Sequence, residues 1–469
     1  MLNDTYHLAV LFGCLALLMT LVVRGKSIFV VAPLCALVAA VLSGVNPIVR
    51  MNEAYMTGFA DYVKRFYLIF ALGAVFGKLM EESGAAISVA NTVGRWLGTH
   101  RACLAVVLAC AVLTYGGVSL FVVGFSVYPL AVQLFRAANL PRRFIPAAIA
   151  FGSITFTMTS AGSPEIQNLI PIKYLIDKAG KPLTDARAGW QVSLIVAALM
   201  FIVGQIYLDW TIRRAKKAGE EFESRADDLE ATSSDGVSES SFIAAISPLL
   251  ATLLALNFVP SLARSYAPSF KDSRFQYLHS FLDNYPTDDG ALAIFIGVLV
   301  GIAVLGRRLK DIWGCFGSGF INGLLAVGST SAVVGFGAAV QDLPAFKLVV
   351  SRVTQLPGDP LVSAAIAMAV IAAIAGSASG GQGIAFPIIK PIYIDQLGVS
   401  ARALHRVVAI SSGTLDSLPA NGYLVMLIRN ICGETHSRSY GPVLVTTVLI
   451  PAAGTVLAIA LFKMFPQWG

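Results

Sequence analysis

Charged residues are scarce in this chain. Asp, Glu, Lys and Arg make up 13% of its 469 residues, whereas hydrophobic residues make up 56%. An ordinary soluble domain carries about a quarter charged residues, so this balance excludes a soluble globular protein and predicts an all-α polytopic membrane protein. Apolar runs near the roughly 20 residues that a membrane-spanning helix needs occur at 7–23, 28–45, 65–80, 102–114, 120–135, 188–212, 241–259, 290–306, 317–341, 361–376 and 440–464.

The chain also lacks the short motifs of metal sites and hydrolytic enzymes. Its six cysteines include no CxxC pair and no His/Cys spacing suited to zinc, so we expect buried, reduced thiols and no metal. No HExxH or GxSxG motif occurs, and neither histidines nor paired carboxylates cluster. These absences argue against an enzyme and against a bound cofactor.

Basic residues exceed acidic ones by 34 to 27, which gives a formal net charge of +7. In a membrane protein this excess is expected, because Lys and Arg collect in short cytoplasmic loops. It therefore does not indicate binding to nucleic acid. The N-terminus has neither a basic region nor a small-residue cleavage site, so we expect 7–23 to be a retained helix rather than a signal peptide.

A hydrophilic stretch at 214–240, rich in Ser, Glu, Asp, Lys and Arg, divides the chain almost at its middle. We expect a flexible cytoplasmic linker there, between a first half, 1–213, and a second half, 241–469. A second polar stretch, 261–289, is expected to be a partly ordered external loop.

The two halves match at a nearly constant offset. Gly116-Gly117 aligns with Gly380-Gly381 at an offset of 264, and 140–155 aligns with 399–414 at an offset of 259. Basic residues precede the apolar run 28–45 but follow its counterpart in the second half, so the two runs cross the membrane in opposite directions. The sequence thus predicts two inverted repeats, as in many secondary transporters, with both chain ends outside.

Each half contains two interruptions where an apolar segment breaks into small polar residues. The first half breaks at 115–119 and 155–168, and the second at 377–383 and 411–422. Non-helical backbone at membrane depth must be buried in protein or line a wet cavity, and paired interruptions point to a transporter's binding site. The glycine-rich breaks are either tips of re-entrant hairpins or unwound helices, or close helix-packing contacts. The many helix breakers in 377–383 favour an interruption.

The break at 155–168 predicts a helix that starts inside the membrane. Ser163, Pro164 and Glu165 resemble a helix N-terminus, with Pro at the first position and Glu in the first turn. The unpaired N–H groups and positive dipole end of such a helix favour an anion. Gln167 and Asn168 add amides that are able to recognise hydroxyl groups of a substrate.

The break at 411–422 adds Asp416. A charged residue at membrane depth is costly and indicates function. Beside an anionic substrate, a carboxylate is a poor ligand but a suitable proton carrier; the alternative is that Asp416 caps the half-helix that follows. Glu165 and His405 are the other candidates for proton coupling, although His405 and Arg406 also suit a role as anchors at the membrane interface.

The candidate substrate-binding residues lie in the four breaks and are small, hydroxyl or amide residues. No catalytic residue is predicted. The candidates are Ser119, Thr157, Thr159, Ser160, Gly162, Ser163, Gln167, Asn168, Ser377, Ser379, Gly380, Gly381, Gln382, Thr414 and Asn421.

Over nearly its whole length the chain resembles the gluconate permease (GntP) family of the ion transporter superfamily. The resemblance is most specific at 379–385, at 405–406 and at 412–422, while 157–168 resembles one subgroup. It implies proton symport of small hydroxycarboxylates such as gluconate or 3-hydroxybutyrate. It also implies a homodimer in which a scaffold domain and a mobile transport domain work as an elevator. The chain departs from the family at Ala420, where members often carry His.

The sequence therefore predicts a proton-coupled importer of a small organic anion in the bacterial inner membrane. A sodium-coupled carrier of the same fold is the alternative, with carbonyls and hydroxyls of the breaks as ligands for Na⁺. A channel is a further alternative, but repeat-related breaks with few pore-lining charges favour a closed, alternating site. Saturable, gradient-coupled flux separates a carrier from a channel.

Overall fold

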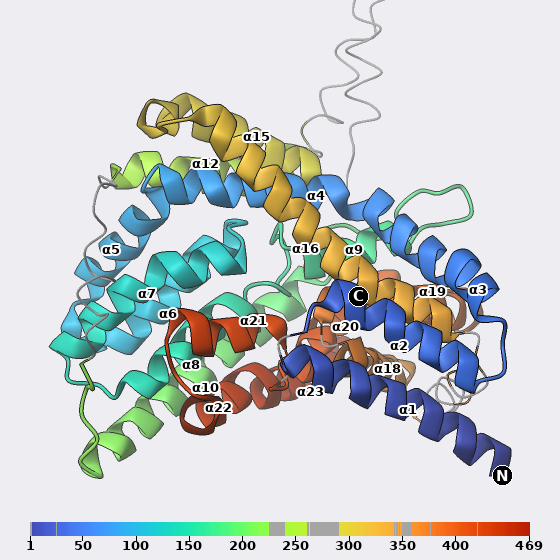
Figure 1. The fold of residues 1–469 in the computed structure, drawn as a ribbon. Helices are drawn as coiled ribbons and strands as arrows, with labels where there is room; N and C mark the ends of the chain where they lie inside the picture. The colour runs from blue at the N-terminus through green and yellow to red at the C-terminus, as the bar shows by residue number, and fades with distance from the viewer. Residues whose placement is uncertain are drawn as a thin grey trace, which may run out of the picture.

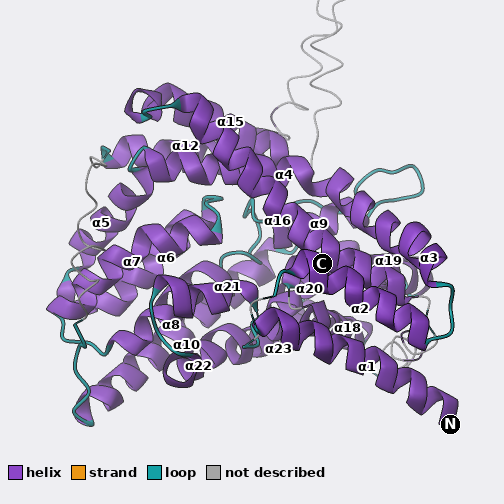
Figure 2. Ribbon diagram, in the orientation of Figure 1, coloured by secondary structure: helices purple, strands orange, loops and turns teal. Residues whose placement is uncertain are grey.

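The computed structural model describes residues 2–24, 26–224, 240–259, 290–341, 358–375, 377–419 and 421–469, with the single positions 262, 343, 346 and 348. Within these residues every regular element is a helix, so the predicted all-α fold is confirmed (Figure 2). Positions 225–239 of the expected linker, nearly all of the polar stretch 261–289, and Ala420 lie outside the described residues.

The elements of the first half include short 3₁₀ and π turns, labelled η. They are α1 (Leu2–Val23), α2 (Ile28–Leu42), α3 (Pro47–Val49), η1 (Arg50–Tyr55), α4 (Met56–Glu82), α5 (Ala85–Leu97), η2 (Thr99–Arg101), α6 (Ala102–Tyr115), α7 (Leu120–Ala137), η3 (Arg142–Phe144), α8 (Ile145–Ala150), η4 (Phe151–Thr155), α9 (Ile166–Tyr174) and α10 (Trp190–Lys217).

The elements of the second half also include short 3₁₀ and π turns. Its elements are α12 (Phe242–Asn257), α15 (Gly290–Leu305), η7 (Gly306–Arg308), α16 (Ile312–Gln341), α18 (Pro360–Ala375), α19 (Ala378–Lys390), η8 (Pro391–Gln396), α20 (Ala401–Leu415), α21 (Gly422–Val425), η9 (Met426–Ile431), α22 (His436–Leu444), η10 (Val445–Leu449), α23 (Ile450–Met464) and η11 (Pro466–Trp468).

Long apolar helices account for several of the predicted spans. In the described chain, four helical stretches are long and apolar enough to cross a membrane, and α5 with η2 and α6 makes a fifth that is bent by 103°. The four are Trp190–Lys217, Gly290–Arg308, Ile312–Gln341 and His436–Met464. On α10, large apolar side chains such as Leu194, Ile202 and Ile206 are exposed, which suits a surface that faces lipid.

The most extensive helix contact joins α4 and α16, whose ribbons run beside each other in Figure 1. Glycines bring the two backbones close together. A Cβ atom at Gly323 would lie 2.5 Å from Cα of Ala71, and one at Gly319 would lie 2.7 Å from Cα of Val75. Small residues at such crossings replace the hydrophobic driving force that lipid cannot supply. Helix α2 packs on α16, while α15 packs on both α4 and α12.

Both halves contain the same order of elements around their breaks. In the first half, α6 and α7 flank the glycine break, and η4 and α9 flank the polar break. In the second half, α18 and α19 flank the glycine break, and α20 and α21 flank the polar break. This order is the one that a repeat at a constant sequence offset predicts.

The breaks of the second half are shorter than predicted. Helix α19 begins at Ala378, so the residues after it up to Gly383 are helical, and α20 continues through Thr414 to Leu415. Packing overrides the low helix propensity of glycine here. A Cβ atom at Gly381 would lie 2.5 Å from Cα of Ala372, and one at Gly383 would lie 2.8 Å from the ring of Tyr62. These glycines therefore serve close packing, and the prediction that 377–383 as a whole interrupts the helix is wrong, because only Ser377 of that stretch is non-helical.

All six cysteines are buried and free, as predicted: Cys14, Cys35, Cys103, Cys110, Cys315 and Cys432. No group of three or more His, Cys, Asp and Glu side chains in the described part of the chain is placed to hold a metal ion.

Candidate substrate and coupling site

Two hydrogen bonds, one helical turn apart, join α19 to α20. At the first, Oδ2 of Asp416 accepts from the backbone N–H of Ala378 at 3.3 Å. At the second, Nε2 of Gln382 donates to Oγ of Ser412 at 2.8 Å. Both partners of the second bond lie four residues from those of the first, so each pair shares one face of its helix. The two breaks of the second half therefore meet.

Asp416 is nearly closed off from solvent, with an exposed fraction of 7%. Neutral donors hold its carboxylate: besides the N–H of Ala378, Oγ of Ser417 donates to Oδ1 at 3.0 Å. The interpretation that Asp416 caps the half-helix after the break is wrong, because Asn421 does so. Oδ1 of Asn421 accepts from the N–H of Leu424 at 3.0 Å, and its Nδ2 donates to the backbone oxygen of Asp416 at 3.1 Å.

The helix that follows the polar break of the first half begins later than the predicted start at 163–165. Helix α9 begins at Ile166, and Glu165 before it is extended, with φ −69° and ψ 147°. Local hydrogen bonds keep the segment from joining the helix. Oγ of Ser163 accepts from the N–H of Glu165 at 3.3 Å, and Nδ2 of Asn168 donates to the backbone oxygen of Ser163 at 2.8 Å. The carboxylate of Glu165 makes no hydrogen bond or ion pair with the described residues.

Several hydroxyl groups of the breaks donate hydrogen bonds to backbone oxygens of their own segments. Oγ1 of Thr157 donates to the backbone oxygen of Ser153 at 2.8 Å, and Oγ of Ser160 donates to that of Phe156. Oγ1 of Thr414 donates to the backbone oxygen of Ser411 at 2.6 Å. Such bonds replace backbone partners lost where helices end. They leave the oxygen lone pairs of these side chains as acceptors.

Gln382 joins the second half of the chain to the first. Its Nε2 donates to the backbone oxygen of Gln167 at 3.1 Å and to Oγ of Ser412. The orientation of this amide is fixed by its neighbours: the backbone oxygen can only accept, and the hydroxyl of Ser412 is committed as a donor to the backbone of Ala409. Gln167, Gln382, Ser412 and Asp416 together are called the interior junction.

Two amide oxygens of the interior junction have no partner. Oε1 of Gln382 and Oε1 of Gln167 are both buried without a hydrogen bond to any described residue. The side chains as a whole are 0% and 9% exposed. A buried carbonyl oxygen without a donor costs about 1–3 kcal/mol, and such a group calls for an explanation, such as water or a ligand. The interior junction therefore contains two buried acceptor oxygens for which the described residues provide no hydrogen-bond donor.

Both polar atoms of the Asn168 side chain, by contrast, have hydrogen-bond partners within the protein. Its Nδ2 donates to the backbone oxygens of Ser163 and Ala186, and its Oδ1 accepts from Arg406 at 3.0 Å. His405 also meets this oxygen through Nε2 at 3.2 Å, while its Nδ1 lies 3.0 Å from the hydroxyl of Thr184. A neutral imidazole that donates through Nε2 and accepts at Nδ1 satisfies both contacts.

Arg406 is completely buried, so its interpretation as an interface anchor is wrong, as it is for the equally buried His405. Its guanidinium donates to the backbone oxygen of Ala188 at 3.0 Å, to Oδ1 of Asn168 and to the backbone oxygen of Thr159. All of these acceptors belong to the first half of the chain. Arg406 thus holds the first polar break against α20 and has little capacity left for a substrate.

Of the other predicted binding residues, Ser119 and Gly162 contact other helices, whereas those at the start of α19 adjoin the interior junction. Ser119 lies against Gly77 of α4, and Gly162 accepts from Asn257 of α12 at 2.9 Å. Ser377 caps α19, where its Oγ accepts from the N–H of Gly380 at 3.2 Å and contacts the hydroxyl of Ser379 at the same distance. The structure therefore brings together the predicted residues of 377–382, Gln167 and Asp416.

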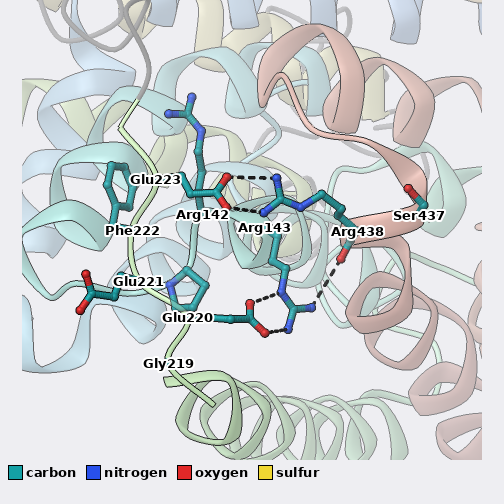
Figure 3. Close-up of a pocket in the computed structure, with 10 residues that line it drawn as sticks. Arg142, Arg143, Gly219, Glu220, Glu221, Phe222, Glu223, Ser437 and Arg438 are labelled. Carbon is teal, nitrogen blue, oxygen red and sulfur yellow. Dashed lines mark hydrogen bonds and ion pairs between the residues drawn. The ribbon is translucent and has the colours of Figure 1, made fainter. Parts of the chain in front are cut away.

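Figure 3 shows a second cluster, at the start of the expected linker, that the sequence did not indicate. Arg143 forms a two-pronged ion pair with Glu220, at 2.7 and 2.9 Å, and Arg438 forms one with Glu223, at 2.7 and 3.0 Å. These four residues are called the rim cluster. They line a cavity of about 600 Å³ that lies away from the breaks; its other lining residues are Pro141, Arg142, Gly219, Glu221, Phe222 and Ser437.

The rim cluster changes the electrostatics of its acids. The guanidinium of Arg143 hydrogen-bonds Glu220 and holds the pKa of that carboxyl below its ordinary value. The sequence signal for the rim cluster is the run of acids that follows the end of α10, within the stretch predicted to be a flexible linker. Tyr440 was also missed: its hydroxyl donates to the backbone oxygen of Ser417, next to Asp416, at 2.9 Å.

A family model for GntP family permeases matches residues 6–465. The chain belongs to the GntP permease family. The resemblance seen in its motifs is thereby confirmed, and the protein is a multi-pass membrane transporter and not an enzyme.

Known permeases and transporters resemble this one over most of their length. The chain is 34% identical to the transporter YxjC of Bacillus subtilis, covering 98% of this chain and 99% of that one. It is 24% identical to the D-serine transporter DsdX of Escherichia coli K12, covering 92% of each. The solved structure of the YdaH transporter of Alcanivorax borkumensis shares the fold, with a TM-score of 0.58 at 16% identity over 88% of each chain.

Proposed function

We propose that this GntP-family permease imports a small organic anion by proton symport across the bacterial inner membrane. The substrate class is a small hydroxycarboxylate, such as gluconate or 3-hydroxybutyrate. Two things support this class. The family resemblance implies it, and the relative DsdX is named for D-serine, an amino acid that carries a hydroxyl group and a carboxylate in addition to its ammonium group.

The observation that carries the proposal is the placement of Asp416. It is a buried carboxylate held by neutral donors, in the interior junction where polar breaks from both halves of the chain meet. An ionisable group in such a place is a functional site by default in a membrane protein. Asp416 is the proton carrier in this proposal, and Glu165 and His405 are secondary candidates.

We also propose an elevator mechanism in a homodimer. Helices α1, α2, α4, α12, α15 and α16 form the scaffold domain, and the helices around the breaks form the transport domain. The matching order of elements in the two halves supports inverted repeats, and the glycine-packed crossing of α4 and α16 supports a rigid scaffold. In this arrangement both chain ends are outside and the linker is cytoplasmic.

A sodium-coupled carrier is the second candidate, and the two unpartnered amide oxygens favour it. Carbonyl and hydroxyl oxygens at broken helices coordinate Na⁺ in transporters of this general kind. Oε1 of Gln167, Oε1 of Gln382 and nearby hydroxyls are such oxygens.

Uptake into proteoliposomes tests the proposal. Purified protein is reconstituted, and accumulation of gluconate and of 3-hydroxybutyrate is measured with an inward pH gradient in sodium-free buffer. We expect saturable accumulation that collapses with a protonophore. Accumulation that strictly requires sodium would support the second candidate, and uptake that never exceeds equilibrium would reject coupling altogether.

A further inference from the structure

The start of α19 is an anion site that the protein itself fills. This helix has 13 residues, and the N–H groups and dipoles at its first turn attract negative charge. Ser377 caps it by accepting from Gly380, while the N–H of Ala378 donates to Oδ2 of Asp416 at 3.3 Å. The carboxylate of Asp416 therefore takes the position that a free carboxylate would take.

A second group at this place lacks a partner. Oε1 of Gln382 belongs to a side chain that is 0% exposed, and it lies one turn further along the helix face that carries Ala378. Its Nε2 is committed to Gln167 and Ser412, so the oxygen is free to accept. A ligand that carries a carboxylate and a hydrogen-bond donor fits the pair, with its carboxylate on the N–H and its donor on the amide oxygen.

We propose, building on the proton symport proposed above, that the substrate carboxylate and the carboxylate of Asp416 compete for the N–H of Ala378. The protonation state of Asp416 determines which of the two binds there. A proton entering from outside binds Oδ2 of Asp416. The neutral carboxyl is no longer attracted to the helix start, and the substrate carboxylate takes its place. On the cytoplasmic side the proton leaves Asp416, and the restored carboxylate displaces the substrate.

This exchange fixes the charge balance of transport. The empty site carries one negative charge, on Asp416. The loaded site also carries one, because Asp416 is then neutral and the substrate brings the charge. A monocarboxylate therefore enters with one proton, and its transport is electroneutral. A dicarboxylate would place a further negative charge among acceptors such as Oε1 of Gln382, so it is excluded.

Among the ionisable groups near the start of α19, Asp416 is the one whose side chain bonds to its first N–H group. Tyr440 of α22 donates to the backbone of Ser417, and Glu165 precedes α9. His405 and Arg406 lie earlier on α20, where both contact Asn168. Among the other helices that pack against α19 and α20, α16 and α18 contain no Asp, Glu, Lys, Arg or His. The remaining charged residues of the packed elements are Lys173 in the last turn of α9, Lys390 in the last turn of α19, Asp395 of η8, Arg402 in the first turn of α20 and Lys463 in the last turn of α23.

Equilibrium binding against pH tests the exchange. Binding of gluconate and of 3-hydroxybutyrate to the purified full-length protein is measured by calorimetry from about pH 5 to about pH 8. Wild-type affinity should fall by about tenfold per pH unit once Asp416 is ionised, because each binding event then takes up one proton. Asp416→Asn imitates the neutral carboxyl, so its affinity should be independent of pH and match the wild type at the acidic end.

Asp209→Asn is the matched control. This acid lies on α10, where it accepts from Gln205 at 2.9 Å, and the same substitution there should leave the pH dependence unchanged. A second variant, Ala378→Pro, removes the contested N–H. Proline suits the first helical position, and Ser377 before it is already extended, with φ −160° and ψ 127°. This variant should remain folded and bind both acids weakly at every pH.

Several results would overturn the exchange. Affinity of the wild type that does not change with pH would do so, as would a folded Asp416→Asn protein that binds neither acid. Loss of pH dependence in Glu165→Gln but not in Asp416→Asn would move the proton to Glu165. Binding needs no gradient, so the exchange can hold while gradient-driven uptake fails, which would reject only the proposed symport. If neither acid binds at any pH, both proposals fail.

Discussion

The interior junction and the rim cluster both join the first half of the chain to later segments, but they use opposite chemistry. In the interior junction, Gln382 donates to a backbone oxygen of the first half, and nearby Arg406 does the same with Thr159. In the rim cluster, Arg143 and Arg438 each hold a glutamate from the segment between the halves. One place relies on buried hydrogen bonds to neutral acceptors, and the other on charge pairs.

Exposure decides what these contacts contribute. Gln382 and Arg406 are fully buried, whereas the side chains of Glu220 and Glu223 are 40% and 55% exposed. An exposed ion pair contributes about 0–1 kcal/mol and is screened by salt, while a buried acceptor that loses its donor costs about 1–3 kcal/mol. The interior contacts therefore hold the breaks in place, and the rim cluster fixes only the start of the linker.

Removing Arg406 should have the largest effect. Arg406→Leu leaves acceptors of Ala188, Thr159 and Asn168 without their donor, at about 1–3 kcal/mol for each buried group. We expect little folded protein, or a large drop in the unfolding temperature measured in detergent. Arg402→Leu is the control, since Arg402 is exposed on the same helix one turn earlier. Equal losses in the two variants would contradict the role assigned to Arg406.

Neutralising Asp416 should abolish accumulation of substrate against a gradient without unfolding the protein. Asp416→Asn keeps the shape of the side chain, but it is neutral at every pH and cannot carry a proton. We expect no accumulation against a gradient in proteoliposomes, while exchange of labelled for unlabelled substrate persists. Full accumulation by this variant would reject its coupling role.

Gln382 should affect selectivity rather than coupling. Its free amide oxygen accepts a donor, so the wild type should bind 3-hydroxybutyrate more tightly than butyrate by about tenfold or more. In Gln382→Met we expect that ratio to approach one. Gln205→Met is the control, because Oε1 of Gln205 is also buried without a partner but lies on α10. A ratio that stays unchanged in Gln382→Met would remove this residue from recognition.

The rim cluster should give the smallest effect. Replacing Glu220 and Glu223 with Gln together should lower the unfolding free energy by about 1 kcal/mol or less, and it should weaken the salt dependence of the wild type. Glu221→Gln changes the same charge on an exposed neighbour that forms no ion pair with the described residues. If Glu221→Gln behaves like the double variant, the effect comes from net charge rather than from the pairs.

The same cluster predicts a pH dependence of definite sign. The pKa of Glu220 is lowered in the folded protein by Arg143. The stability that this pair contributes is therefore complete above the pKa of glutamate in the unfolded chain, and it is lost as the pH falls through the lower folded value. The Glu220→Gln variant should lack this component in acid unfolding scans, which are compared with those of Glu221→Gln. The effect is small because the pair is partly exposed.

Much of the fold and part of the site could be predicted from sequence. Composition indicates the membrane class, the motifs indicate the family, and the breaks locate Asp416 and Gln382. The extent of the breaks could not be predicted, because glycines at 380–383 are tolerated inside a helix where another chain segment packs closely. Local propensity contains no information about that neighbour.

The hydrogen-bond partners of individual side chains could not be predicted from the sequence either. Asn168 and Gln167 are adjacent amides in the sequence, yet one is fully bonded and the other has a free oxygen. The difference arises because Arg406, 238 residues away, donates to the side chain of Asn168, whereas Gln382 donates to the backbone oxygen of Gln167 and not to its side chain. Asp416 likewise caps a helix that precedes it by 38 residues, a contact that no local capping pattern indicates.

The burial of all six thiols makes the native chain suitable for accessibility labelling. A thiol-specific reagent applied from water has no exposed cysteine to react with, so a single cysteine introduced at a break supplies the whole signal. Replacing Ser377 at the cap of α19 in this way would report from which side of the membrane, and in which ligand state, the helix start becomes wet. Because the native cysteines are already shielded by packing, they do not have to be replaced before such a measurement.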